Sequence, residues 1–139
     1  MKRALSVLSI ATVSVVLLAA GGTNKKSNRP FLGLWEGVDV NDGSKRTISI
    51  TDHDRDSVVE VAARDTYWTL CDGDRGIELA KGGVRHDGVL ATDGLVTCFE
   101  TAVEISVLQT YELSQRDDTL FATPHGTSLI PITLHRVSK

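Results

Sequence analysis

The stretch VEISVLQTYEL, residues 103–113, decides the fold class of this chain. Apolar residues alternate with polar or charged residues along it, and only Leu108 and Gln109 break the pattern. A period of two is typical of a β-strand that buries one face in a core. The residues expected on the buried face are Val103, Ile105, Val107, Tyr111 and Leu113, and those expected on the solvent face are Glu104, Ser106, Thr110 and Glu112.

Further segments after Phe31 have a similar character, and none of them carries a convincing helical stripe. Asp, Gly and Asn end most of them, as expected for tight turns. Eight short strands in succession predict an all-β fold, a small antiparallel up-and-down barrel that closes on itself and leaves no open edge. A two-sheet β-sandwich is the alternative. The predicted strands are 33–40, 45–51, 58–70, 76–85, 89–100, 102–113, 119–123 and 130–137.

The N-terminus has the three parts of a secretory signal peptide. Lys2 and Arg3 are followed by a run without charge, 4–20, whose last residues are small. We therefore predict a signal peptide over residues 1–20, cleaved after Ala20. An uncleaved membrane anchor is the alternative, but a spanning helix needs roughly 20 apolar residues, and this run is shorter and interrupted by hydroxyl side chains.

Processing at this point predicts an exported protein, periplasmic or extracellular. Residues 21–30 have no large apolar side chain and are expected to form a flexible linker before a single domain, 31–139. A bacterial lipoprotein signal requires a cysteine directly after the cleavage site, and Gly21 stands there instead. Lipid anchoring is therefore not predicted, nor is stable membrane insertion after cleavage.

The charge of the mature chain excludes one class of partner. Removal of residues 1–20 takes away only Lys2 and Arg3, which leaves 13 basic and 18 acidic residues and a net charge of −5. Binding to nucleic acid depends on basic side chains that displace counterions from phosphates. No basic stripe of that kind is present, so no nucleic-acid partner is predicted.

The two cysteines, Cys71 and Cys98, predict one disulfide bond, since an even number in a short exported chain is typical of structural cross-links. They end the third and fifth predicted strands, which lie ~9–10 Å apart in a simple meander. A disulfide bridges Cα atoms less than ~7 Å apart. One cysteine is therefore expected in a loop that folds over the rim of the barrel.

Two short motifs at the ends of the domain resemble the calycin superfamily, which includes lipocalins, fatty-acid-binding proteins and avidin-like barrels. They are Gly33-Leu34-Trp35 at the start of the first strand and Arg136 in the last. The resemblance implies an eight-stranded barrel in which Trp35 closes one end and Arg136 packs across its ring. It also implies a small apolar ligand inside the barrel, unless the two residues are a purely structural plug.

One acidic turn has the spacing of a calcium loop. Carboxylates at its first, third and fifth positions and a carbonyl at its seventh are typical of such loops. Ser57 and Ala63 stand where a calcium loop has Gly and a bidentate Glu, so a solvated turn is the alternative. The candidate Ca²⁺ ligands are Asp52, Asp54, Asp56 and Glu60.

No catalytic residues are predicted, and the chain is not expected to be an enzyme. The four histidines lie in separate segments without the spacing of a metal site, and no serine has the context of a hydrolase nucleophile. Three glutamates offer a carboxylate pair only if their strands turn them into the barrel. They are Glu36, Glu60 and Glu104.

These observations support three functional hypotheses. The first is a non-enzymatic exported barrel that binds a small apolar ligand. The second is a secreted protein-interaction or inhibitor module with a filled core, and the third is a calcium-dependent module that uses the acidic turn. Tyr67 and Trp68 are neighbours, so one of the two rings is expected on the surface, where it would mark a binding face.

Overall fold

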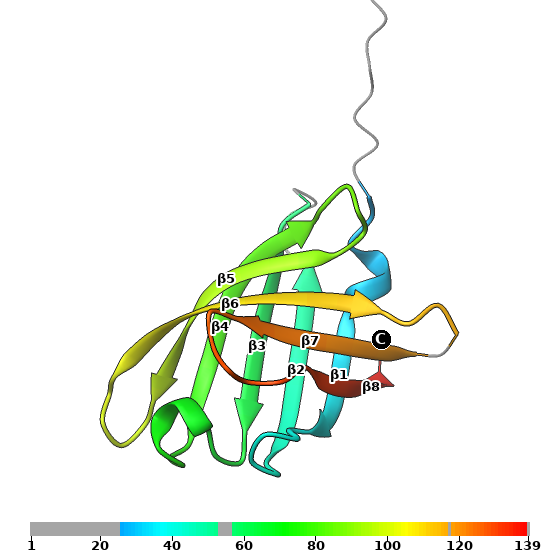
Figure 1. The fold of residues 1–139 in the computed structure, drawn as a ribbon. Coiled ribbons are helices and arrows are strands. Elements are labelled where there is room, and N and C mark those ends of the chain that lie inside the picture. The colour runs from blue at the N-terminus through cyan, green and yellow to red at the C-terminus, as the bar shows by residue number, and fades with distance from the viewer. Residues whose placement is uncertain (1–25, 53–56, 117, 139) are drawn as a thin grey trace, which may run out of the picture.

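The computed structural model describes residues 26–52, 57–116 and 118–138, and these form one closed antiparallel barrel (Figure 1). Each strand pairs with the next along the chain, and the last strand pairs with the first. None of the helices in these ranges is long and apolar enough to cross a bilayer. The strands are Gly33–Val38 (β1), Lys45–Asp52 (β2), Val59–Asp65 (β3), Gly76–Val84 (β4), Leu90–Cys98 (β5), Glu104–Leu113 (β6), Thr119–His125 (β7) and Ile132–Ser138 (β8).

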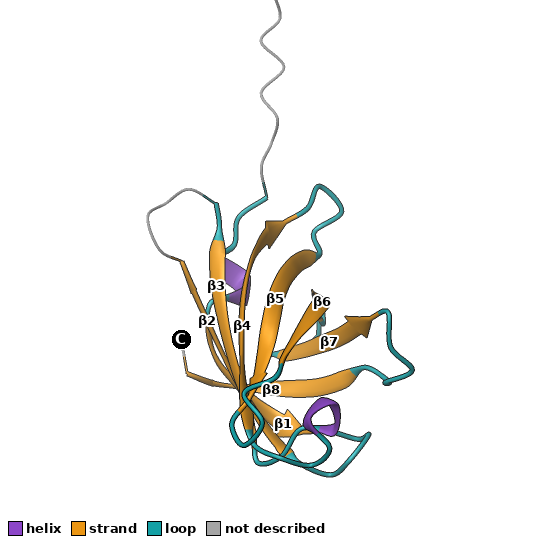
Figure 2. Cartoon of the chain, turned by 90° about the vertical axis from the view of Figure 1, so that its left-hand side faces the viewer, coloured by secondary structure: helices purple, strands orange, loops and turns teal. Residues whose placement is uncertain are grey.

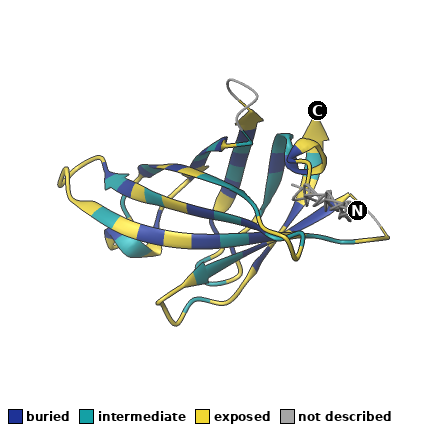
Figure 3. Cartoon of the chain, turned by 90° about the horizontal axis from the view of Figure 1, so that it is seen from above, coloured by how far each residue is buried: buried dark blue, intermediate teal, exposed yellow. Residues whose placement is uncertain are grey.

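Alternate residues of the strands point into the barrel, so bands of buried and exposed residues succeed each other along them (Figure 3). The all-β prediction and the closed barrel are confirmed. In the stretch that decided the fold class, Val107, Gln109 and Tyr111 face inward and Leu108 faces outward. The alternation of inward and outward positions therefore continues through Leu108 and Gln109. At these two positions the apolar residue points to solvent and the polar residue points into the core.

Trp35 and Arg136 close one end of the barrel together. They are paired in register on β1 and β8, and the Arg136 guanidinium lies 3.9 Å from the centre of the fully buried Trp35 ring. The Trp35 indole donates to the carbonyl oxygen of Phe31 at 2.8 Å, in a short 3₁₀ helix, Arg29–Phe31 (η1). The contact implied by the calycin resemblance is present, and it is part of a lid over the barrel end.

Removing the Arg136 side chain should weaken this lid measurably. Its guanidinium also donates to the carbonyl oxygens of Leu32 and Pro30, at 2.6 and 2.7 Å. We expect Arg136→Ala to lower the free energy of unfolding by about 2 kcal/mol, since it loses these bonds and the cation–π contact. Urea unfolding followed by Trp fluorescence measures this change, and an unaltered midpoint would contradict the structural role.

The third predicted strand, 58–70, was too long. β3 ends at Asp65, and the chain then forms a loop with a 3₁₀ turn, Thr69–Cys71 (η2). The strand ends there because Trp68 turns back on itself, donating its backbone N–H to the carbonyl oxygen of Asp74. Trp68 is buried and Tyr67 is exposed, so the expected division between the two rings is confirmed, although in a loop.

That loop resolves the geometric problem of the disulfide. Cys71 lies in η2 and Cys98 at the end of β5, with their Cα atoms 5.6 Å apart. The predicted disulfide is confirmed, and so is the expectation that one cysteine lies in a loop.

The prediction that Val103 lies on the buried face of the sixth strand is wrong. Val103 precedes β6 and is 51% exposed.

Strand β4 buries a charged residue and exposes an apolar one, whereas its sequence predicts the reverse. Leu79 points outward and is 59% exposed, whereas Glu78 points inward and is fully buried. The small inward residues of β4 and β5 let the two strands lie close together. A Cβ atom at Gly82 would meet the carbonyl oxygen of Ala91 at 1.9 Å, and one at Gly94 would meet the Ala80 side chain at 2.4 Å.

Candidate functional site

Four hairpin loops gather at the end of the barrel opposite the Trp35 lid (Figure 2). In an up-and-down barrel every second connection lies at the same end. We call this set the loop platform. It consists of residues 39–44, 66–75, 99–103 and 126–131. Loops that a rigid scaffold holds in place are the usual site of binding in β folds.

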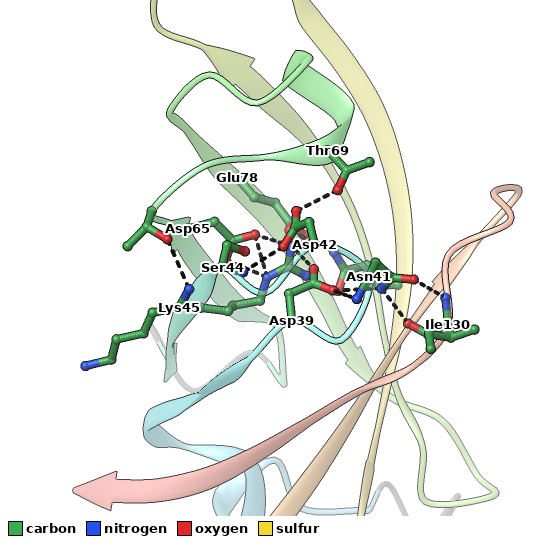
Figure 4. A network of polar contacts seen from close by, with 12 residues as sticks. Asp39, Asn41, Asp42, Ser44, Lys45, Asp65, Thr69, Glu78 and Ile130 are labelled. Carbon is green, nitrogen blue, oxygen red and sulfur yellow. Dashed lines mark hydrogen bonds and ion pairs between the residues drawn. The ribbon is translucent and has the colours of Figure 1, made fainter.

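Asn41 ties the first loop of the platform to the last. Its side-chain amide donates to the carbonyl oxygen of Ile130 at 3.1 Å and accepts from the backbone N–H of Ile130 at 2.8 Å (Figure 4). The same amide donates to Asp39 at 2.7 Å. This reciprocal pair is a polar bridge between neighbouring loops on the barrel rim that are 89 residues apart in sequence.

Asp42 ties the first loop to the second. Its carboxylate accepts from the Thr69 hydroxyl at 2.6 Å, and its backbone carbonyl accepts from the Tyr67 hydroxyl at 2.7 Å. Burial by itself raises the pKa of Asp42, but the hydrogen bonds from Thr69 and Ser44 outweigh it and hold that pKa below its ordinary value. The bridge is therefore strongest when Asp42 is ionised.

The second and third loops are joined covalently and by hydrogen bonds. The Cys71–Cys98 disulfide links them, and Asp74 accepts from the backbone N–H of Glu100 at 2.7 Å. The backbone N–H of Phe99 adds a bond of 2.9 Å to the carbonyl oxygen of Arg75. All four loops are thus connected in series, so the platform is held as one unit.

Arg46 contacts the platform from inside the barrel and links residues at the base of its loops. It projects from β2 into the barrel, where its guanidinium binds both oxygens of Asp65 and lies 3.3 Å from Asp39. Its charged end stacks over the Trp68 ring at 4.6 Å from the ring centre. Burial raises the pKa of Asp65, and Arg46 opposes that rise. One buried cation thereby anchors the bases of two loops.

The platform exposes apolar side chains although its backbone is fixed. At least one large exposed side chain comes from each loop, with exposed fractions between 36% and 60%. Rigid loops that present apolar groups to solvent are a mark of a binding surface, because little conformational entropy remains to be lost on association. These side chains are Val40, Tyr67, Phe99, Val103 and Ile130.

A depression of about 560 Å³ lies between the second and third loops, beside the disulfide. Leu70 and Val103 form part of its wall, and the charged residues that line it are three acidic ones and one basic one: Asp72, Asp74, Glu100 and Arg75. A lining that is acidic on balance and apolar in part suits a long basic side chain, which buries its stem and pairs its charge.

Within the described ranges, large side chains such as Trp35 and Tyr111 occupy the barrel interior, and its centre is polar. Glu78 is fully buried and accepts a hydrogen bond of 2.8 Å from the Gln109 amide. Burial raises the pKa of Glu78 to about 7, since the partial compensation from Arg46 is smaller. Burial, and then the charge on Glu78, raise the pKa of Tyr111 well above its ordinary value. The cavity between Gln109 and the platform has a volume of about 20 Å³, room for about one water molecule.

Removing the Asn41 bridge should loosen the platform without unfolding the barrel. We expect Asn41→Ala to cost about 1 kcal/mol, because the lost bonds are largely exposed to water. Amide hydrogen exchange at Ile130 should accelerate more than tenfold, while amides in β3 keep their rates. Equal acceleration in both places would indicate global destabilisation and would contradict the bridge.

The carboxylates considered for calcium or catalysis are not brought together in the described ranges. Asp54 and Asp56 lie outside those ranges, Asp52 is exposed at the end of β2, and Glu60 lies 2.9 Å from Lys81. The sequence left open which face Glu36, Glu60 and Glu104 take, and in the structure all three lie on the outer face of their strands.

Among the described residues, no group of three or more His, Cys, Asp or Glu side chains is placed to hold a metal ion. The carboxylate at the centre of the barrel is Glu78, which the sequence alone does not indicate because Ile77 and Leu79 beside it predict the opposite face. One signal for it existed: Gln109 breaks the alternation of β6, and a buried amide needs a polar partner.

Comparison with protein-family models, with curated proteins and with solved structures found no match to this chain.

Proposed function

We propose that this protein is an exported, non-enzymatic interaction module that binds a protein partner with its loop platform. The observation that carries the proposal is the combination of a filled barrel with four cross-linked loops that expose apolar side chains. Pre-organised loops of this kind lose little entropy on binding. The second hypothesis from the sequence, a module with a filled core, is thus the one we favour.

The chemistry of the platform specifies the partner. Exposed apolar groups such as Phe99 and Ile130 suit an apolar contact, and the depression between the second and third loops suits a basic side chain. We therefore propose a protein partner that presents a Lys or Arg next to apolar residues. The acidic balance of the chain supports this choice, because it favours encounter with basic surfaces.

Site-specific photocrosslinking in the producing cells tests the proposal. A photoreactive residue in place of Phe99 should yield an adduct of discrete mass, whereas the same residue in place of Val137, which is exposed at the other end of the barrel, should not. Adding Ile130→Glu to the Phe99 probe should reduce the yield at least tenfold, and adding Phe121→Glu, on the outer wall, should leave it unchanged. No adduct at Phe99, or equal adducts at both ends, would overturn the proposal.

Export is a separate part of the proposal and has its own test. It rests on the signal-peptide pattern of residues 1–20, which lie outside the described residues. The intact mass of the protein from its producing cells should correspond to a chain that starts at Gly21 and carries one disulfide. A mass that includes residues 1–20 would contradict cleavage.

The two other hypotheses have less support. An apolar ligand inside the barrel would have to displace packed side chains and contact the buried Glu78 and Gln109. Burying apolar groups against a polar centre sacrifices its hydrogen bonds. A calcium loop would have to use Glu60, whose carboxylate already has Lys81 as a partner.

A further inference from the structure

The outer face of β4 and β5 exposes two leucines where solvent-facing strands normally carry polar residues. Leu79 and Leu95 lie directly opposite each other in register and are 59% and 41% exposed. Their inward neighbours on the same strands include Glu78, Thr92 and Gly94. These strands thus place leucines in solvent and polar or small residues in the core, which is expected of a face that another surface covers.

The same face is hollowed. A depression of about 400 Å³ crosses β2 to β5, with Leu79 and Leu95 among its lining residues. In register with these leucines lie Ala62 on β3 and Ser49 on β2. Because the side chains of Ala62 and Ser49 are small, the depression lies over them. The face therefore has both protruding leucines and a hollow that can receive the leucines of another surface.

Charges of both signs flank the leucines. Lys81 and Asp93 lie directly opposite each other, two residues along from Leu79 and Leu95. Lys81 also contacts Glu60 at 2.9 Å across β3 and β4. The face therefore carries an apolar pair and a pair of opposite charges, each with one member on β4 and one on β5.

We propose that this face binds a second copy of the chain. A two-fold axis parallel to the strands, between β4 and β5, exchanges the two strands across the interface. It places Leu79 on Leu95 of the partner subunit and, by the same rotation, Lys81 on Asp93 of the partner subunit. One rotation thus satisfies both the apolar and the charged contacts.

This self-complementarity favours a second copy over an unrelated protein. In a two-fold interface every contact occurs twice: if residue i of one subunit contacts residue j of the other, then j also contacts i. The patch must therefore be complementary to itself after a rotation of 180°. The antiparallel register supplies that match, because the leucines are opposite each other and the charges are opposite each other. The face lies on the barrel wall, so the loop platform stays free and a dimer would present two platforms.

Sedimentation velocity on the protein purified from its producing cells tests the proposal. The wild type should sediment as a dimer that dissociates on dilution. Leu79→Glu should weaken the dimer at least tenfold, while Phe121→Glu, a matched change at an exposed apolar residue of β7, should not. Both side chains are exposed, so at concentrations low enough for the wild type to be monomeric the melting temperatures of the two variants should equal that of the wild type.

Charge reversal tests the axis itself. Asp93→Lys and Lys81→Asp should each weaken the dimer at least tenfold, and the two together should restore it, since the pair is re-formed with reversed signs. A wild type that is monomeric at every concentration, or a Leu79→Glu variant that dimerises as tightly as the wild type, would overturn the proposal. So would a double reversal that does not recover association, or open-ended assembly in place of a dimer.

Discussion

Replacing Glu78 by Gln should make the protein more stable above pH 7 and should leave its stability unchanged near pH 4. The folded protein raises the pKa of Glu78 from 4.5 to about 7, because the carboxylate is buried. Between these two values the unfolded chain loses a proton that the folded chain keeps. The free energy of unfolding of the wild type should therefore fall as pH rises through this window, by roughly 3 kcal/mol from this group.

Urea unfolding of wild type and Glu78→Gln at several pH values measures the effect. The amide has nearly the size of the carboxyl group and can still pair with Gln109, so packing is preserved. The difference between the two proteins, rather than either profile alone, isolates Glu78 from other titrating groups. Glu112→Gln, at an exposed position of β6, is the matched control and should follow the wild type. Parallel profiles for wild type and Glu78→Gln would contradict the assignment.

Removing the disulfide should cost more stability than removing the Asn41 bridge. Cys71 and Cys98 are separated by 27 residues, and a loop of this length corresponds to about 3.5 kcal/mol on the chain-entropy model. Cys71→Ser with Cys98→Ser should lower the free energy of unfolding by that amount. The barrel should still form, since the strand pairing of β4 with β5 does not depend on the bond.

Urea unfolding with and without a reductant measures this loss. The reductant should shift the wild-type midpoint and leave the double serine variant unaffected. Hydrogen exchange should accelerate in the two loops that the bond joins, 66–75 and 99–103. If the partner recognises a rigid platform, the yield of crosslinking at Phe99 should also fall when the disulfide is removed. An unaltered midpoint after complete reduction would contradict the stabilising role.

Much of the fold followed from local patterns. The alternation in 103–113 and the turn residues between segments predicted eight antiparallel strands, and the strand bounds differ mostly at their ends. Strand ends are poorly predicted because hydrogen bonds to neighbouring loops decide them. The extra length given to the third strand shows this: Trp68 is apolar enough for a strand, but its backbone bonds to Asp74 instead.

The candidate site followed from the sequence only in fragments. The disulfide was predicted, and so was one exposed ring of the pair Tyr67 and Trp68, although not which of the two; both features lie in the platform. The Asn41 bridge and the contact of Arg46 with Asp65 were not, because they join residues whose local context is that of ordinary turns and strand ends. Nothing in a single segment indicates which other loop will lie next to it on the barrel rim.

The sequence by itself determined that this chain forms a sheet with a period of two and that Cys71 joins Cys98. Only the tertiary structure decided which face of β4 is inside. Composition favours burying Leu79, but the pairing of β4 with β3 and β5 sets the inward positions, and these include Glu78. The physical reason is that a closed barrel admits one register for all its strands, so a single strand cannot turn over to bury its own best residues.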